Sequence, residues 1–189
     1  SIFPEMKRIV VAIDPAATSK TGSDLTGIVV CGLGKDGNGY VLGDETGRYQ
    51  PEEWARKAVA LYRLHEADRI VAEVNNGGEM VAATIRAHDA TVPVRDVRAT
   101  RGKSVRAEPI AALYELGKVF HAHGLSDLED QCCAVTVGFD SKEQGWSPDR
   151  VDALVWGMTE LFEQMTRKKP AEQPRPRPRP MSDTSWMSM

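Results

Sequence analysis

Residues 8–14 read RIVVAID, and this stretch decides the fold. Every position from Ile9 to Ile13 is apolar, which is typical of a strand that is buried on both faces at the centre of a sheet. The strand ends in Asp14, which is followed by Pro15 and a small polar loop. We therefore expect a central strand that places the carboxylate of Asp14 at its carboxyl end. The alternative explanation for this acid is an ordinary Asp-Pro turn.

Two more strands are expected to follow, at about residues 25–32 and 40–44. The sequence KDGNG at residues 35–39 contains the Asp-Gly and Asn-Gly pairs that form hairpin turns, so the first three strands should be antiparallel. A helix that opens at Pro51 then leads into a second fully apolar strand, RIVAEV at residues 69–74. The order strand, helix, strand predicts a parallel crossover.

The rest of the chain continues this alternation. Expected elements are a helix around 79–88, a strand at 94–98, a helix at 104–116, a short strand at 119–121, and a helix with Ser147 as its N-cap and Pro148 at its first position. We therefore predict an α/β fold: a mixed sheet of three antiparallel strands and then parallel strands, with helices on both faces. Residues 1–166 would form one domain. Residues 167–189 contain Arg-Pro repeats, which cannot supply a core and predict a flexible tail.

The composition limits the class of protein. A chain of 189 residues with 41% hydrophobic content has the size of one ordinary domain, and a net charge of −3 argues against coating nucleic acid by bulk electrostatics. The sequence has no run of about eighteen apolar residues and no charged leader, so we expect no membrane span and a cytoplasmic location. The three cysteines, Cys31, Cys132 and Cys133, are expected to be reduced core residues.

Carboxylates from three separate elements are expected to meet at one point. Asp14 and Glu73 each lie near the end of a buried strand, and if the first strand is central they emerge side by side where ligands bind in open sheets. Asp149 and Asp152 lie one turn apart on the last helix and share a face. Such like charges repel unless cations neutralise them, and hard oxygen ligands select magnesium or manganese. The sequence therefore predicts two divalent ions, Mg²⁺ or Mn²⁺, that support hydrolysis of a phosphodiester.

Some of these acids also have a simpler explanation. An acid in the first turn of a helix is favoured by the helix dipole, which would account for Asp149 alone. Glu73 could be an exposed acid on an edge strand, although its neighbours are apolar. Asp152 lies deeper, beside a stripe of apolar residues, so helix capping does not account for it.

Two segments near this edge of the sheet suit a DNA backbone. Asn76 and Gly77 belong to the sequence NNGG, whose backbone amides could approach a phosphate at the start of the next helix. Basic residues gather further on, at Arg95, Arg98, Arg101, Lys103 and Arg106. We expect Arg101, Lys103 and Arg106 to hold phosphates without reading base sequence. The alternatives are an ordinary strand-to-helix turn and a solvated run of charge.

Four segments together resemble the C-terminal nuclease domain of the large terminase subunit of tailed bacteriophages and related gene transfer agents. They are IDPA at 13–16, AEVNNGG at 72–78, RGKSVRAEP at 101–109 and SPDRVDALVW at 147–156. The resemblance runs from about Arg8 to Leu161. It implies an RNase H-like fold and a metal-dependent endonuclease that cuts concatemeric DNA during packaging.

The resemblance also implies which residues bind metal. Asp14, Glu73 and Asp152 each fall on a matching acid and would be the ligands. Asp149 falls at a position that in related nucleases and resolvases is also acidic or histidine.

The resemblance implies partners as well: double-stranded DNA, a packaging ATPase domain, a small terminase subunit and a portal, in the cytoplasm of a bacterial host. The sequence has no Gly-x-x-x-x-Gly-Lys-Ser/Thr loop, so DNA translocation is not assigned to it, and we expect an excised domain.

Other functions remain open. The nearest is another RNase H-like nuclease, such as a junction resolvase or a ribonuclease H, which substrate preference would distinguish. A noncatalytic DNA-binding module would instead bind without metal and without cleavage. An actin-like or sugar-kinase ATPase needs a duplicated domain and a second phosphate loop, for which this chain has no room.

Overall fold

A six-stranded mixed sheet organises the molecule, with the strand order β5-β4-β1-β2-β3-β6. The computed structural model describes residues 3–16, 25–74, 79–100, 102–135 and 145–163. The strands are β1 (Met6–Asp14), β2 (Gly27–Gly34), β3 (Gly39–Asp44), β4 (Arg69–Glu73), β5 (Val94–Val97) and β6 (Val119–His121). Strands β1, β2 and β3 are antiparallel, whereas β4 and β5 continue in parallel from β1, and β6 pairs in parallel with β3. The predicted mixed sheet with a central first strand is therefore confirmed.

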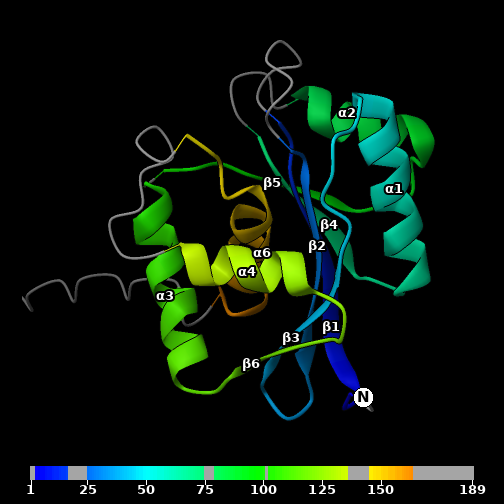
Figure 1. Cartoon of the computed structure of the whole chain (residues 1–189). Helices are drawn as coiled ribbons and strands as arrows, with labels where there is room; N and C mark the ends of the chain where they lie inside the picture. Colours follow the sequence, from blue (N-terminus) through cyan, green and yellow to red (C-terminus); the bar gives the residue numbers. More distant parts are fainter. Residues whose placement is uncertain (1–2, 17–24, 75–78, 101, 136–144, 164–189) are drawn as a thin grey trace, which may run out of the picture.

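Helices cover both faces of this sheet, as predicted (Figure 1). One face carries α1 (Pro51–Leu64) and α2 (Glu79–His88), and the other carries α3 (Lys103–Glu115), α4 (Ser126–Ala134) and α6 (Asp149–Leu161). No described helix has the length and apolarity that crossing a membrane requires. The tail that we predict at 167–189 lies outside the described residues.

The apolar side chains of β1 pack into two hydrophobic cores, one on each face of the sheet. Val10 and Ala12 pack in the cluster that contains α6, whereas Val11 and Ile13 pack in the cluster that contains α1. Successive side chains of a strand point to opposite faces, so a central strand covered on both sides must be apolar at every position. The packing thus explains why the run shows no alternation with polar residues.

Helix α6 lies unusually close to the sheet. A Cβ atom added at Gly157 would lie 2.6 Å from the Sγ atom of Cys31, and one added at Gly27 would lie 2.2 Å from the carbonyl oxygen of Asp149. Only glycine permits both approaches, one on the helix and one on β2. The close contact fixes the first turn of α6 beside the carboxyl end of β1.

Ion pairs attach the far, C-terminal end of α6 to the sheet. The side chain of Glu160 is almost fully buried, and it contacts Arg8 at 2.6 Å, Arg95 at 2.7 Å and Arg69 at 3.4 Å. These arginines come from β1, β5 and β4, so one carboxylate ties the helix to three neighbouring strands.

Some expected details were wrong. Helix α6 begins at Asp149, because the backbone of Pro148 is not helical and its carbonyl accepts the first helical hydrogen bond, from the Asp152 amide at 2.8 Å. Pro148, and not Ser147, therefore occupies the capping position. Strand β2 begins at Gly27, two residues later than predicted. The preceding residue, Thr26, pairs with Gly47 in an isolated bridge that is not part of the strand.

Helix α4 was not predicted. Leu128 is its only fully buried apolar residue, so its sequence lacks a helical apolar stripe. The cysteines also differ from expectation: Cys31 is buried and Cys132 is half-buried, but Cys133 is exposed at the end of α4.

Candidate active site

The four predicted acids lie at the carboxyl end of the central strands. Asp14 ends β1 and Glu73 ends β4, and the two strands are parallel neighbours in which Ile13 is paired with Ala72. The first turn of α6 adds Asp149 and Asp152. Glu73, Asp149 and Asp152 are each only 5–7% exposed. Three elements that are distant in sequence thus place buried acids at one edge of the sheet.

The charges of these acids act on one another. Burial raises the pKa of Asp14 well above its usual value, and the negative charges of Glu73, Asp152 and, more weakly, Asp149 raise it further, while Lys103 opposes the shift. Burial likewise raises the pKa of the Asp152 carboxyl, against the lowering effect of Lys103 and Arg106. The carboxyl group of Asp14 thus interacts electrostatically with all three other acids. The four predicted residues therefore form one electrostatic cluster.

Two cations and an indole contact this cluster. The Nζ atom of Lys103 forms an ion pair with Oδ2 of Asp152 and lies 3.4 Å from the hydroxyl of Ser147. The Nη1 atom of Arg106 lies 3.6 Å from Oε2 of Glu73. The indole N–H of Trp156 donates to the same Glu73 oxygen at 2.6 Å.

The carboxylate of Asp149 also contacts the backbone of a segment that is distant in sequence. Its Oδ2 atom accepts a hydrogen bond from the backbone N–H of Leu25 at 3.0 Å. The acid therefore also fixes the segment that precedes β2, beyond the dipole effect that its place in the first turn provides.

The cluster is suited to cations and to an anion beside them. Within the described ranges, no three His, Cys, Asp or Glu side chains lie close enough together to enclose a metal ion. The donors are nonetheless hard oxygens, and among the residues with described positions four acids lie beside two cationic side chains, an excess of negative charge of the kind that divalent ions neutralise. In the described part of the chain, the buried Nε and Nη1 atoms of Arg106 have no hydrogen-bond partner, so an anion beside Glu73 would satisfy them.

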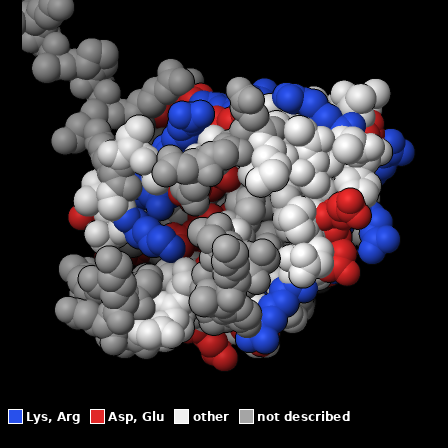
Figure 2. All heavy atoms as spheres, turned by 90° about the horizontal axis from the view of Figure 1, so that it is seen from above, with Lys and Arg blue, Asp and Glu red and all other residues white. Residues whose placement is uncertain are grey.

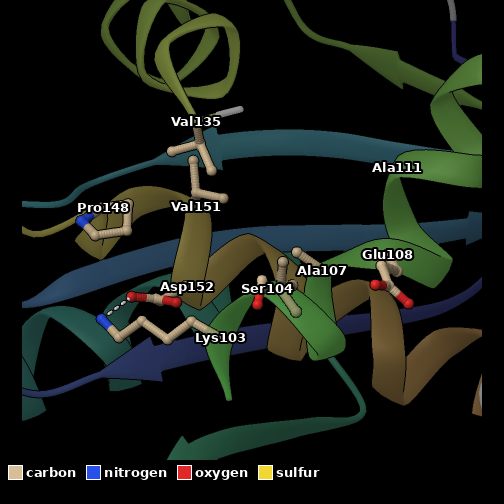
Figure 3. Close-up of a pocket in the computed structure, with 10 residues that line it drawn as sticks. Lys103, Ser104, Ala107, Glu108, Ala111, Val135, Pro148, Val151 and Asp152 are labelled. Atoms are coloured by element: carbon tan, nitrogen blue, oxygen red, sulfur yellow. Dashed lines mark hydrogen bonds and ion pairs between the residues drawn. The ribbon is translucent and has the colours of Figure 1, made fainter. Parts of the chain in front are cut away.

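A pocket of about 170 Å³ adjoins the cluster between α3 and α6 (Figure 3). The ion pair of Lys103 and Asp152 lies at one end, and the remaining wall is mostly apolar, with Ala107 and Val151 among its residues. Viewed onto this end of the molecule, acidic side chains lie in a hollow with basic side chains beside them (Figure 2).

The residues that we predict to contact DNA differ in how exposed their side chains are. The side chain of Lys103 is 48% exposed, whereas that of Arg106 is 12% exposed and lies against Trp156. Asn76, Gly77 and Arg101 lie outside the described residues.

One residue of the predicted basic patch, Arg95, does not lie with the others. It forms ion pairs with Glu160 and, at 2.7 Å, with Glu163, so it belongs to the ion-pair cluster around Glu160 at the other end of α6.

Trp156 is the site residue that the sequence did not reveal. Its position four residues after Asp152, on the same helix face, was the available signal.

The fold defines the class of protein: an RNase H-like domain, built on a mixed sheet whose central strands end beside buried acids. The family described as terminase RNaseH-like domain matches residues 11–161, and the chain belongs to this family. A comparison with curated protein sequences gave no significant match.

Solved structures of terminase nucleases share the fold. The large terminase nuclease of thermophilic phage G20c has 14% sequence identity and a TM-score of 0.59, over 81% of this chain and 82% of its own. The nuclease domain of the large terminase subunit gp2 of bacterial virus Sf6 has 14% identity and a TM-score of 0.59, over 87% and 90%. A mutant of the Sf6 domain, solved with manganese and beta-thujaplicinol, has 15% identity and a TM-score of 0.58, over 87% and 90%.

Proposed function

We propose that this domain is a metal-dependent endonuclease that cleaves double-stranded DNA concatemers during the packaging of a viral or virus-like genome. The observation that carries the proposal is the convergence of Asp14, Glu73, Asp149 and Asp152 at one edge of the sheet, where burial and then the charges of the other acids raise the pKa of Asp14. The family of the chain and its fold support the same conclusion.

Asp14, Glu73 and Asp152 would hold two divalent ions, Mg²⁺ or Mn²⁺, with Asp149 as a flanking acid. When bound, such ions activate water and stabilise the charge that develops on the phosphate in an in-line displacement. The carboxylates themselves have two tasks: they supply the oxygen ligands, and their burial keeps these ligands in place.

The basic residues would hold the substrate. Lys103 is half exposed and touches Asp152, so its ammonium can turn from the carboxylate to a DNA phosphate once the acids are neutralised. Two buried donors of Arg106, its Nε and Nη1 atoms, find no hydrogen-bond partner among the described residues, and the same phosphate group would satisfy them. Arg101, Asn76 and Gly77 would extend the contact along the backbone. Such contacts position DNA without reading its sequence.

The proposed setting is the cytoplasm of a bacterial host, during assembly of a phage or a gene transfer agent. The domain would act together with a packaging ATPase domain, a small terminase subunit and a portal. These partners come from the family to which the chain belongs, and the described residues contribute the nuclease centre alone.

The deciding experiment is a cleavage assay on supercoiled and linear duplex DNA with Mg²⁺, with Mn²⁺ or with a chelator. We expect nicking and linearisation with either metal and none with the chelator. Binding without cleavage under all three conditions would instead identify a noncatalytic DNA-binding module. Branched junctions and RNA–DNA hybrids serve as competing substrates, and preferential cutting of either would assign the domain to a resolvase or a ribonuclease.

A further inference from the structure

Trp156 joins two groups of the candidate site that come from different elements. Its indole N–H donates to Oε2 of Glu73, at the end of β4, in a buried hydrogen bond of 2.6 Å. The guanidinium of Arg106, on α3, lies over the face of the same ring, with its Cζ atom 4.5 Å from the ring centroid. One side chain therefore contacts both the acid and the cation.

The hydrogen bond restricts a torsion that is otherwise free. The terminal torsion of a glutamate is broad, so burial alone does not fix where the two carboxylate oxygens lie. An N–H donor on Oε2 selects one orientation and leaves Oε1 free of that donor. Carboxylates that bind metal are commonly held in this way, and the supporting residues strongly affect metal affinity.

The ring also holds Arg106 in place. A guanidinium over an indole face is attracted to the π-electron density, and this attraction grows when both groups are shielded from water. The side chain of Arg106 is 12% exposed and lies 3.6 Å from Glu73, too far for a hydrogen bond, so the contact with the indole ring helps to hold it there.

The backbone position of Trp156 is set independently of the site. The neighbouring residue, Gly157, lies against Cys31 and Ala12 so closely that a side chain there would overlap with Cys31. Helix α6 can therefore neither rotate nor withdraw from the sheet without losing this contact. The indole ring is therefore carried by a part of the helix that packs closely against the sheet.

We propose that Trp156 is a positioning residue: its indole N–H sets the orientation of the Glu73 carboxylate for metal binding, and its ring face holds Arg106 beside that carboxylate. This inference rests on the proposed function, because it takes Glu73 as a metal ligand. Its central requirement is the N–H group, which phenylalanine lacks while it keeps an aromatic face.

The test compares Trp156→Phe with Trp54→Phe. Trp54 is also buried, but it lies on α1 in the core on the opposite face of the sheet, so it controls for the loss of a buried indole. The affinity for Mn²⁺ is measured by titration calorimetry, and the unfolding temperature without metal reports the fold. We expect Trp156→Phe to weaken Mn²⁺ binding about tenfold or more and Trp54→Phe to leave it unchanged. Equal affinities in wild type and Trp156→Phe would overturn the proposal.

A second comparison keeps the test decisive if Trp156→Phe lowers stability. In a Glu73→Gln background, Trp156→Phe should cause no further loss of Mn²⁺ affinity, because the residue through which Trp156 acts is already changed. The same additional loss in both backgrounds would show that Trp156 does not act through Glu73. Failure of the proposed function has a different signature: wild type would then bind Mn²⁺ and leave plasmid DNA uncut.

Discussion

The two ends of α6 both bury acids, but they balance the charge in opposite ways. At the far end, a single carboxylate, that of Glu160, meets three arginines from three strands. At the near end, four carboxylates lie beside two basic side chains of the described residues, Lys103 and Arg106. The same helix thus carries a cluster with surplus cations and a cluster with surplus acids.

This difference separates structure from function. A buried acid with arginine partners is neutralised from within the protein and needs nothing else. Burial raises the pKa of Asp14 and Asp152, and the repulsion of neighbouring acids adds to the shift of Asp14, so cations from outside would stabilise the charged cluster. Charge balance, more than burial, distinguishes the near end as the candidate site.

The largest expected effect is on catalysis, at the near end. Asp14→Asn should reduce cleavage of plasmid DNA in Mn²⁺ by about 10³-fold or more, which is about 4 kcal/mol of barrier, because a metal ligand is lost. The fold should remain intact, as circular dichroism would check. A variant that still cuts at the wild-type rate would remove Asp14 from the site.

The next effect is on stability, at the far end. Glu160→Gln removes the carboxylate that the three arginines share, although Arg95 keeps its pair with Glu163. The substitution should lower the free energy of unfolding by about 2–3 kcal/mol, somewhat less than for a fully buried pair, because the arginines are partly exposed. Urea unfolding measures the change. Glu5→Gln is the matched control, since its ion pair with Lys35 is exposed and should contribute under about 1 kcal/mol. Loss of cleavage by Glu160→Gln at unchanged stability would break the distinction between the two ends.

A smaller effect concerns DNA binding. Replacing Lys103 and Arg106 together by alanine should weaken duplex binding and make its salt dependence shallower, by up to about two in the slope of log K against log salt. Filter binding over a range of salt concentrations measures this slope. Lys57→Ala with Arg63→Ala removes two basic residues of α1 that have acidic partners, and the slope should not change. If both pairs behave alike, Lys103 and Arg106 are not phosphate contacts.

The smallest effect is on the pH dependence of stability without metal. The raised pKa of Asp14 means that the folded state binds its proton more tightly than the unfolded state, whose aspartates titrate near pH 4. Wild type should therefore lose stability relative to Asp14→Asn as the pH rises from about 4 through the raised pKa. Urea unfolding in chelator across this range checks the sign. A wild type that gains stability over the variant with rising pH would contradict the proposed repulsion.

Much of this architecture could be predicted from local sequence. The unbroken apolar run before Asp14 indicated a central strand, and the Asp-Gly and Asn-Gly pairs after Lys35 indicated the hairpin. The topology then followed, because parallel crossovers place strand ends at one edge. This is why the acids of β1, β4 and α6 could be expected together before their positions were known.

Side-chain partners could not be predicted in the same way. The sequence shows that Arg95 and Arg106 are basic, but it does not show that one is bound by Glu160 and the other stacks on Trp156. Helix α4 was missed for a related reason, since its short polar sequence is held in place by neighbours from other elements. Interactions across long sequence separations depend on the finished packing, which local patterns do not encode.

The dependence of the acidic cluster on α6 has a consequence for protein synthesis. Strand β1 leaves the ribosome before the last described helix, and its aspartate gains its helical partners only after that helix has emerged and docked against the sheet. Contacts this distant in sequence form late in folding. The proposed nuclease site therefore forms only after α6 has docked against the sheet, so a chain still in synthesis lacks it.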